Sequence, residues 1–294
     1  MLAEFSGLDA TEFMVAHSPE RVYSGRVFQD FSAYPKLVGG TTPAAAARCV
    51  EFYETVLTFD NRPDLDRPNG VWDLGSAEAA EFAKLAGTTY RDVNIALANE
   101  FARFAEKTGV DIGKVIDASN SQPYSHILRP GIWVGGHCIP VYPRFYTSVD
   151  VDATLPVTAR EVNTAVPNRV IARLGALMDG LKGKRIVVWG ATYRGGVMET
   201  AVSDVFPVVD ALRSAGAHPL VHDPLYSDEE ISGMGFAPYT FGQQCDGAIV
   251  QSGHEGYNKI DPSDMPGISA IYDGRSCLDP TVWSAITYLR IGVG

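Results

Sequence analysis

The densest group of residues that could do chemistry is the segment at residues 135–140, which reads GGHCIP. Two adjacent glycines let a backbone pass close to a ligand, and a cysteine that follows them in a loop can act as a nucleophile. Cys138 is therefore our candidate nucleophile. The alternative is a small core cysteine, which is the more frequent role of a single cysteine. We interpret Cys49, Cys245 and Cys277 as core residues of that kind.

A second group lies on an expected long helix. Lys84, Thr88 and Arg91 are spaced i, i+4 and i+7, so they share one face of that helix. A cation on such a face can stabilise negative charge that develops on a reacting oxygen. The alternative is the solvated face of a surface helix. Asn94 lies on the same helix, where asparagine is mildly unfavourable, so we expect the helix asparagines to have hydrogen-bond partners.

A third candidate is the turn at residues 188–196, which reads VWGATYRGG. Backbone amides after a strand, together with Arg194, could hold a phosphate. The turn does not have the GxGxxG spacing, which occurs nowhere in the chain, and a glycine-rich turn is often only a turn. The histidines are scattered without metal-ligand spacing, so we expect no metal site.

Composition limits the classes of protein to which the chain can belong. Its 294 residues are 46% apolar and 20% charged, which is typical of a soluble globular protein with two or three domains. A formal net charge of −11 argues against a general binder of nucleic acid or of anionic membranes. No stretch approaches the roughly 20 apolar residues that span a bilayer. Four widely spaced cysteines favour a reducing cytoplasm.

The elements that must position these residues can be read from periodicity and from turn residues. We expect strands and loops in the first forty residues, with a sheet edge at 13–17 and 36–38 that another segment or chain covers. Helices are predicted at residues 43–57, 76–108, 111–119, 156–181 and 204–214. The catalytic segment at 129–142 should be a loop. Apolar runs predict strands of a parallel α/β sheet at residues 184–190, 219–222, 247–251 and 270–273.

Together these segments resemble the UDP-glucose/GDP-mannose dehydrogenase family. The resemblance is closest to the branch that oxidises UDP-N-acetylmannosamine or UDP-N-acetylglucosamine to the uronic acid. The matching pieces occur in family order over nearly the whole chain. They are SPERV at 18–22, PKLVGG at 35–40, AKL at 83–85, YRDVNIALANE at 90–100, GGHCIP at 135–140, REVN at 160–163 and DGR at 273–275.

The resemblance implies an α/β fold in three parts. Residues 1–45 would be the remnant of an N-terminal NAD-binding Rossmann domain, whose glycine-rich fingerprint has no counterpart here. Residues 46–180 would form a central helical domain with the catalytic loop, and residues 181–294 a Rossmann-like domain that binds the UDP-sugar. The family also implies NAD as cofactor, a sugar nucleotide as substrate, a homodimer through the central helices, and a cytoplasmic location.

The resemblance also assigns roles to single residues. Cys138 would add to the intermediate aldehyde, giving a thiohemiacetal and then a thioester, while Lys84 stabilises the oxyanion and Glu20 serves the acid–base or water site. The substrate would be bound by Arg91, Thr88, Asn94, Arg194 and Tyr142, and Arg275 would contribute to cofactor binding.

Several positions depart from the family pattern. Thr88 replaces an asparagine, Trp133 a glycine, Tyr142 an aspartate, Arg194 a lysine and Ala201 an arginine. A phenol with a pKa near 10 is a poor substitute for a carboxylate base. Three hypotheses follow: a nucleotide-sugar 6-dehydrogenase, a degenerate or repurposed relative that binds a nucleotide- or sugar-like ligand without hydride transfer, and a protein whose cysteine does covalent chemistry without NAD.

Overall fold

The computed structural model describes residues 2–9 and 12–294, and the chain divides into two compact units, Met1–Gly87 and Thr88–Gly294. The finer division into three parts, with boundaries after residues 45 and 180, remains a prediction. Among the helices of the described residues, none combines the length and the apolar character that a membrane span requires.

The first unit is built on a small mixed sheet. β2 (Lys36–Gly40) lies between β1 (Ala16–His17), which runs antiparallel to it, and β3 (Val71–Asp73), which runs parallel to it. α3 (Pro43–Val56) packs against this sheet. β3, a strand that we did not predict, pairs with residues 36–38, so another segment of the chain covers this part of the edge, as expected.

Two short helices also correct the expectation of strands and loops in the first forty residues. They are α1 (Leu2–Ser6) and α2 (Val27–Ala33). Each has at most two turns, which is too short for a helical period to show in the sequence.

The two helices with the strongest start signals form as expected. The Thr42 side chain accepts a hydrogen bond from the amide of Ala45 at 3.1 Å, and Pro43 is the first residue of α3. α4 (Ala77–Thr108) begins in the first unit and continues into the second. It ends at Gly109, whose φ of 71° is readily adopted only by glycine.

The second unit adds three helices before its sheet. α5 (Ile112–Asn120) follows the N-cap Asp111 as predicted, and α7 (Thr154–Leu177) ends four residues before the predicted 181. α6 (Tyr142–Val149) was not predicted and begins where the catalytic loop ends. The loop itself, at residues 129–141, is confirmed.

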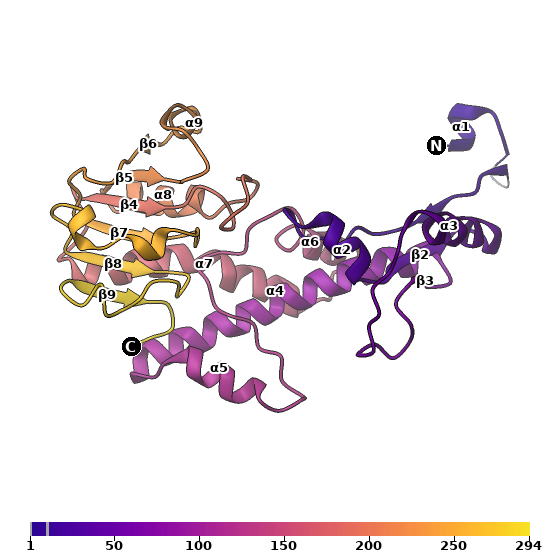
Figure 1. Cartoon of the computed structure of the whole chain (residues 1–294), viewed down its shortest axis with the longest axis horizontal. Coiled ribbons are helices and arrows are strands. Elements are labelled where there is room, and N and C mark those ends of the chain that lie inside the picture. The colour runs from indigo at the N-terminus through magenta and orange to yellow at the C-terminus, as the bar shows by residue number, and fades with distance from the viewer. Residues whose placement is uncertain (1, 10–11) are drawn as a thin grey trace. The chain divides into compact units, whose positions relative to one another are not determined.

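The second unit contains the predicted parallel sheet, which has six strands in place of the four that we predicted, because β6 and β9 are added (Figure 1). Its strand order is β6-β5-β4-β7-β8-β9, with all neighbours parallel. The strands are β4 (Arg185–Trp189), β5 (His218–His222), β6 (Ala237–Pro238), β7 (Gly247–Val250), β8 (Ala270–Asp273) and β9 (Thr287–Arg290). The connections include α8 (Val205–Ser214), α9 (Asp228–Gly233) and the 3-10 turns η2 (Tyr257–Lys259) and η3 (Pro262–Asp264). The strand order reverses between β4 and β7, which is where open α/β sheets form a ligand crevice.

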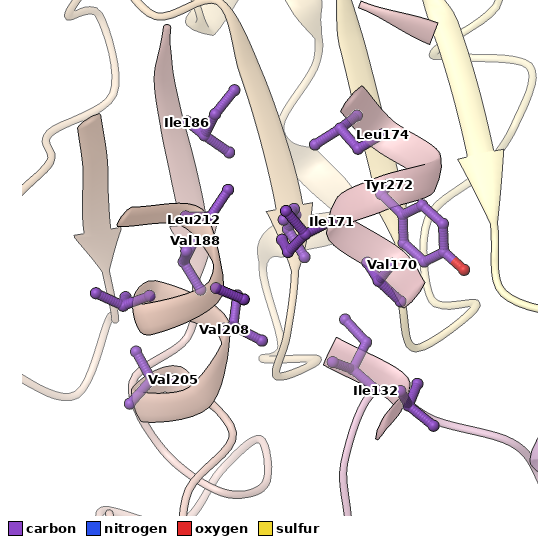
Figure 2. Close-up of a cluster of buried hydrophobic side chains, with 14 of the residues drawn as sticks. Ile132, Val170, Ile171, Leu174, Ile186, Val188, Val205, Val208, Leu212 and Tyr272 are labelled. Carbon is purple, nitrogen blue, oxygen red and sulfur yellow. The ribbon is translucent and has the colours of Figure 1, made fainter. Parts of the chain in front are cut away.

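Alternation along β4 separates two cores. Ile186 and Val188 point into a cluster beneath α7 and α8, as Figure 2 shows, while Val187 and Trp189 belong to an aromatic cluster on the opposite face. Leu174 of α7 is fully buried in the first cluster. The sheet is therefore buried on both sides, as a parallel sheet requires.

Replacing Leu174 by alanine is expected to lower the free energy of unfolding by about 2–5 kcal/mol, because a buried side chain is lost and a cavity remains. Leu177 on the same helix is 51% exposed, so Leu177→Ala should change it by less than about 0.5 kcal/mol. Urea unfolding followed by circular dichroism measures both. Equal losses for the two variants would contradict the packing of α7 on the sheet.

Candidate active site

Glu20, Lys36 and Lys84 lie together in the first unit. The Nζ of Lys36 donates to Glu20 Oε2 at 3.0 Å, and Lys84 Nζ donates to the backbone carbonyl of Glu20. The amides of Arg21 and Val22 donate to Glu20 Oε1 at 2.7 and 3.1 Å. Burial by itself raises the pKa of Glu20, but these hydrogen bonds outweigh it and the pKa is lowered. Glu20 is therefore a carboxylate at neutral pH, able to accept a proton from water.

Cys138 belongs to the second unit, where it is half-buried in the turn before α6. Its carbonyl accepts hydrogen bonds from the amides of Val141 and Tyr142, at 3.1 and 2.9 Å. This half-buried position contradicts the alternative interpretation, in which Cys138 is a small buried core residue. That interpretation holds for Cys245, which is buried, but it is wrong for Cys277, which is exposed in the loop after β8.

Two asparagines of α4 hold the segment that leads to Cys138. Asn94 accepts from the amide of Leu128 at 2.8 Å and donates to the carbonyl of His126 at 2.7 Å. Asn99 accepts from the amide of Gly131 at 3.1 Å. The expectation that the helix asparagines have partners is confirmed. The substrate-binding role of Asn94 remains a prediction, because both ends of its amide already bind this segment.

The far end of the same segment requires glycine. A Cβ on Gly135 would lie 2.8 Å from Tyr193 Cβ and 2.9 Å from the carbonyl of Val202. The catalytic segment therefore packs tightly against the loop at residues 191–203, which joins β4 to α8. Sequence reasoning missed this contact, because nothing local marks a pairing between residues almost 60 positions apart.

A cationic cleft of about 370 Å³ lies beside the start of this segment in the second unit. It is lined by Asp111, Ile112, Gly113, Lys114, Asp117, Arg129, Pro130, Arg275, Ser276, Arg290 and Ile291. Its four cations outnumber its two carboxylates, although Arg129 and Arg290 form ion pairs with those carboxylates, Asp117 and Asp111. Such a cleft can attract an anion, and arginine suits phosphate in particular.

Arg275 is held in place at the edge of this cleft. Its Nη2 lies 2.6 Å from Asp204 Oδ2, and its Nε donates to the carbonyl of Gln251. A Cβ on Gly131 would lie 2.9 Å from Arg275 Nη1, so the backbone at Gly131 lies close against the guanidinium. The segment that leads to Cys138 is therefore in contact, at Gly131, with the guanidinium of Arg275, which Asp204 and the carbonyl of Gln251 hold in place.

Asp204 is fully buried, and its Oδ1 has no hydrogen-bond partner among the described atoms. Burial raises the pKa of Asp204 to about 6, because the charged form loses its hydration, and the neighbouring Arg275 offsets this only in part. Sequence reasoning did not identify this carboxyl group as part of a site.

The turns that could cradle a dinucleotide are filled by the chain itself. A Cβ on Gly190 would lie 2.4 Å from Ser252 Cβ, and one on Gly195 would lie 1.8 Å from the carbonyl of Gly253. In the first unit, a Cβ on Gly39 would meet the carbonyl of Ser76 at 1.8 Å. These glycines serve close packing within the chain, so none of the three positions leaves room for the pyrophosphate of NAD.

The remaining predicted site residues are spread over the second unit. Thr88 and Arg91 lie on α4, where Thr88 is buried and Arg91 half-buried, so the solvated-face interpretation is wrong there. Arg194 lies in the loop at residues 191–203, and Tyr142 is the first residue of α6. That these side chains bind substrate, and that Lys84 and Glu20 meet Cys138, remain predictions.

The raised pKa of Asp204 predicts a pH dependence of stability. This carboxyl group has a pKa near 3.8 when unfolded and about 6 when folded, so the folded chain binds more protons between these values. The stabilisation of the folded state by this tighter proton binding is complete below pH 4 and is lost as the pH rises through 6. Relative to the wild type, Asp204→Asn should therefore gain up to about 3 kcal/mol in the free energy of unfolding from pH 4 to pH 7. Urea unfolding at both pH values measures this, and a constant difference would contradict it.

Comparison with known proteins places these features in a family. The model of the UDP-glucose/GDP-mannose dehydrogenase family, central domain, matches residues 78–165, and that of its UDP binding domain matches residues 187–280. A UDP-N-acetyl-D-mannosamine dehydrogenase of Methanocaldococcus jannaschii is 33% identical over 92% of this chain. An NDP-N-acetyl-D-galactosaminuronic acid dehydrogenase of Ralstonia nicotianae is 32% identical over 69% of the chain and 46% of its own length.

Solved structures agree with the sequence comparison. The UDP-D-ManNAc dehydrogenase of Pyrococcus horikoshii has a TM-score of 0.82 and 26% identity, covering 99% of this chain and 68% of its own. The chain spans 61% of the length of the M. jannaschii relative. The predicted α/β fold, with a helical central region and a parallel sheet, is confirmed. The chain therefore belongs to the UDP-glucose/GDP-mannose dehydrogenase family.

Proposed function

We propose that this chain carries the thiol and the nucleotide-sugar site of a nucleotide-sugar 6-dehydrogenase that converts a UDP-N-acetylhexosamine to its uronic acid. One observation carries the proposal: a single segment runs from the anchored Arg275 at Gly131 to the half-buried Cys138. If the diphosphate of the nucleotide sugar binds in the cationic cleft, its sugar would extend along this segment towards Cys138. The relatives that are named as dehydrogenases of N-acetylhexosamine nucleotides support this substrate class.

The chain's own residues would do three things in this reaction. The Cys138 thiolate would add to the aldehyde carbon of a half-oxidised sugar, forming a carbon–sulfur bond and an oxyanion. The ammonium group of Lys84 would stabilise that oxyanion, and the Glu20 carboxylate would take a proton from the water that cleaves the later thioester. NAD is the oxidant in this proposal, and its site would lie outside the residues described here.

A second candidate is a relative that binds a nucleotide sugar without hydride transfer. The glycine turns filled by backbone favour it, together with Trp133 and Tyr142, which stand in the catalytic segment where the family has glycine and aspartate. NADH formation from NAD and a UDP-N-acetylhexosamine, by the chain supplied with an NAD-binding domain or partner chain, would support the dehydrogenase. Binding of the sugar nucleotide without NADH formation, and without stabilisation by NAD, would support the second candidate.

We also propose that the protein is a cytoplasmic homodimer that pairs through its central helices. An apolar cleft of about 650 Å³ lies between α4, α6 and α7 in the second unit. Leu155 beside it is 71% exposed, and Tyr90 and Leu97 are exposed as well. A surface of this kind is typical of a protein–protein interface. Four cysteines without a disulfide suit a reducing compartment.

The cationic cleft can be tested by ligand affinity. Arg129 lines it and is 57% exposed, so Arg129→Gln removes a cation at little cost to folding. We expect about tenfold weaker binding of UDP-N-acetylglucosamine or UDP-N-acetylmannosamine in isothermal titration calorimetry, because a charge-assisted hydrogen bond is lost. Arg213→Gln on α8, with 51% exposure, is the matched control and should bind as the wild type does. Unchanged affinity in the cleft variant would refute the assignment of the cleft.

The dimer can be tested by introducing charge. Leu97→Glu and Leu155→Glu should each shift the molar mass towards that of a monomer in size-exclusion chromatography with light scattering, because a buried unpaired carboxylate opposes association. Val282→Glu, at a residue that is 41% exposed near the sheet, is the control and should leave the mass unchanged. A monomeric wild type, or variants that remain dimeric, would contradict an interface at these helices.

A further inference from the structure

The loop at residues 191–203 contacts the catalytic segment through polar groups as well as through packing. The amide of Gly136 donates to the carbonyl of Ala201 at 3.1 Å, and Trp133 Nε1 donates to the carbonyl of Val202 at 3.1 Å. His137 Nε2 lies 3.2 Å from a carboxylate oxygen of Glu199, also in the loop. Three residues of the catalytic segment, Trp133, Gly136 and His137, therefore contact this loop.

The loop has no helix or strand of its own to hold it. It contains a non-glycine residue with a positive φ, Val202 at 49°, which is unfavourable for a β-branched side chain. Such a conformation persists only where the surroundings impose it. Trp133 thus bonds to Val202, the non-glycine residue of the loop with a positive φ. Other contacts must therefore hold the loop in this conformation.

That support comes from a buried pair at the carboxyl ends of β5 and β7. Asp223 Oδ2 accepts hydrogen bonds from the amides of Ala191 and Thr192, at 2.7 and 3.0 Å. His254 Nε2 lies 3.0 Å from the same oxygen and 2.9 Å from the Thr192 hydroxyl. The amide of Gly196 donates to His254 Nδ1 at 3.3 Å.

These contacts define the state of the imidazole. Because Nδ1 accepts a hydrogen bond from Gly196, it carries no proton, and the neutral ring carries its proton on Nε2, where it can be donated to Asp223. His254 therefore joins two points in the first half of the loop, Gly196 directly and Thr192 both directly and through Asp223. All of these groups except Gly196 are buried. Water therefore cannot readily replace a hydrogen bond that is lost there, and its loss costs free energy of folding.

We propose that His254 is a positioning residue for Cys138: it holds the loop at residues 191–203, and that loop in turn holds the catalytic segment. It does not touch the reacting atoms of the proposed reaction. The inference depends on the proposed function in one respect only, which is that Cys138 is the catalytic nucleophile. Whether His254 orders the segment can be read directly from the protein, with no substrate and no cofactor.

The test is hydrogen–deuterium exchange measured by mass spectrometry on the full chain. In His254→Gln, the glutamine amide nitrogen can still donate to Asp223, but the side chain has no acceptor at the position of Nδ1, where the Gly196 amide binds. We expect exchange to rise about tenfold both in peptides from the loop, 191–203, and in peptides from the catalytic segment, 131–142. A purely local structural role would raise exchange in the loop alone, and that result would overturn the proposal.

His222→Gln is the matched control. His222 is at the same edge of the sheet, but its ring lies 3.0 Å from the hydroxyl of Tyr257 and its side chain does not bond to the loop. Exchange at residues 131–142 should stay at the wild-type value in this variant. A rise equal to that of His254→Gln would show that any damage to this edge loosens the segment, and would overturn a specific role for His254.

A milder variant covers the case in which His254→Gln does not fold. Thr192→Val keeps the shape of a buried side chain but removes the hydroxyl that lies 2.9 Å from His254. We expect about a threefold rise in exchange at residues 131–142, with a parallel change in the alkylation rate of Cys138 by iodoacetamide. Unchanged exchange and alkylation in this variant would contradict the proposed connection.

Discussion

The second unit depends on one buried carboxylate. Asp92 of α4 is fully buried and accepts hydrogen bonds from Arg160 Nε at 2.6 Å and from Asn163 Nδ2 at 2.9 Å, both on α7. Asn163 in turn accepts from Asn99 at 2.9 Å, and Asn99 accepts from the amide of Gly131. Burial raises the pKa of Asp92, although Arg160 and Asn163 oppose the shift. The network joins α4 and α7 to Gly131, which lies in the segment that carries Cys138.

Such a network tolerates little displacement. Removing a charged group from water is costly, and only a complete set of partners in good geometry compensates for it. A slip of α7 along α4 by one turn would separate Arg160 from Asp92 and leave a buried charge unpaired. The register of the two helices and the entry of the catalytic segment are thus specified together, and the asparagines, which are poor helix formers, are explained by this requirement.

The same network shows what the sequence could predict. The motifs at residues 90–100 and 160–163 were recognisable, and long helices, the loop around Cys138 and the central strands followed from apolar periodicity and turn residues. The contact of Glu199 with His137 and the pairing of Asp204 with Arg275 were not predictable, because they join residues 62 and 71 positions apart with no local signal. β3 and α6 were missed because they are short and their apolar pattern is weak, and the tertiary contacts around them decide their conformation.

The strand order bears on how this chain can recognise a nucleotide. In a parallel sheet the crevice at the reversal between β4 and β7 would be the expected ligand site. Here the turn at Gly190 and Gly195 packs closely on residues 252–253 beside that crevice and is held there by Asp223 and His254. The cationic cleft lies elsewhere, beside α5 and the ends of β8 and β9. Recognition of a diphosphate would therefore depend on arginine side chains such as Arg129 and Arg275 rather than on amides of a glycine turn, and buried acids such as Asp204 would determine how those arginines are aimed.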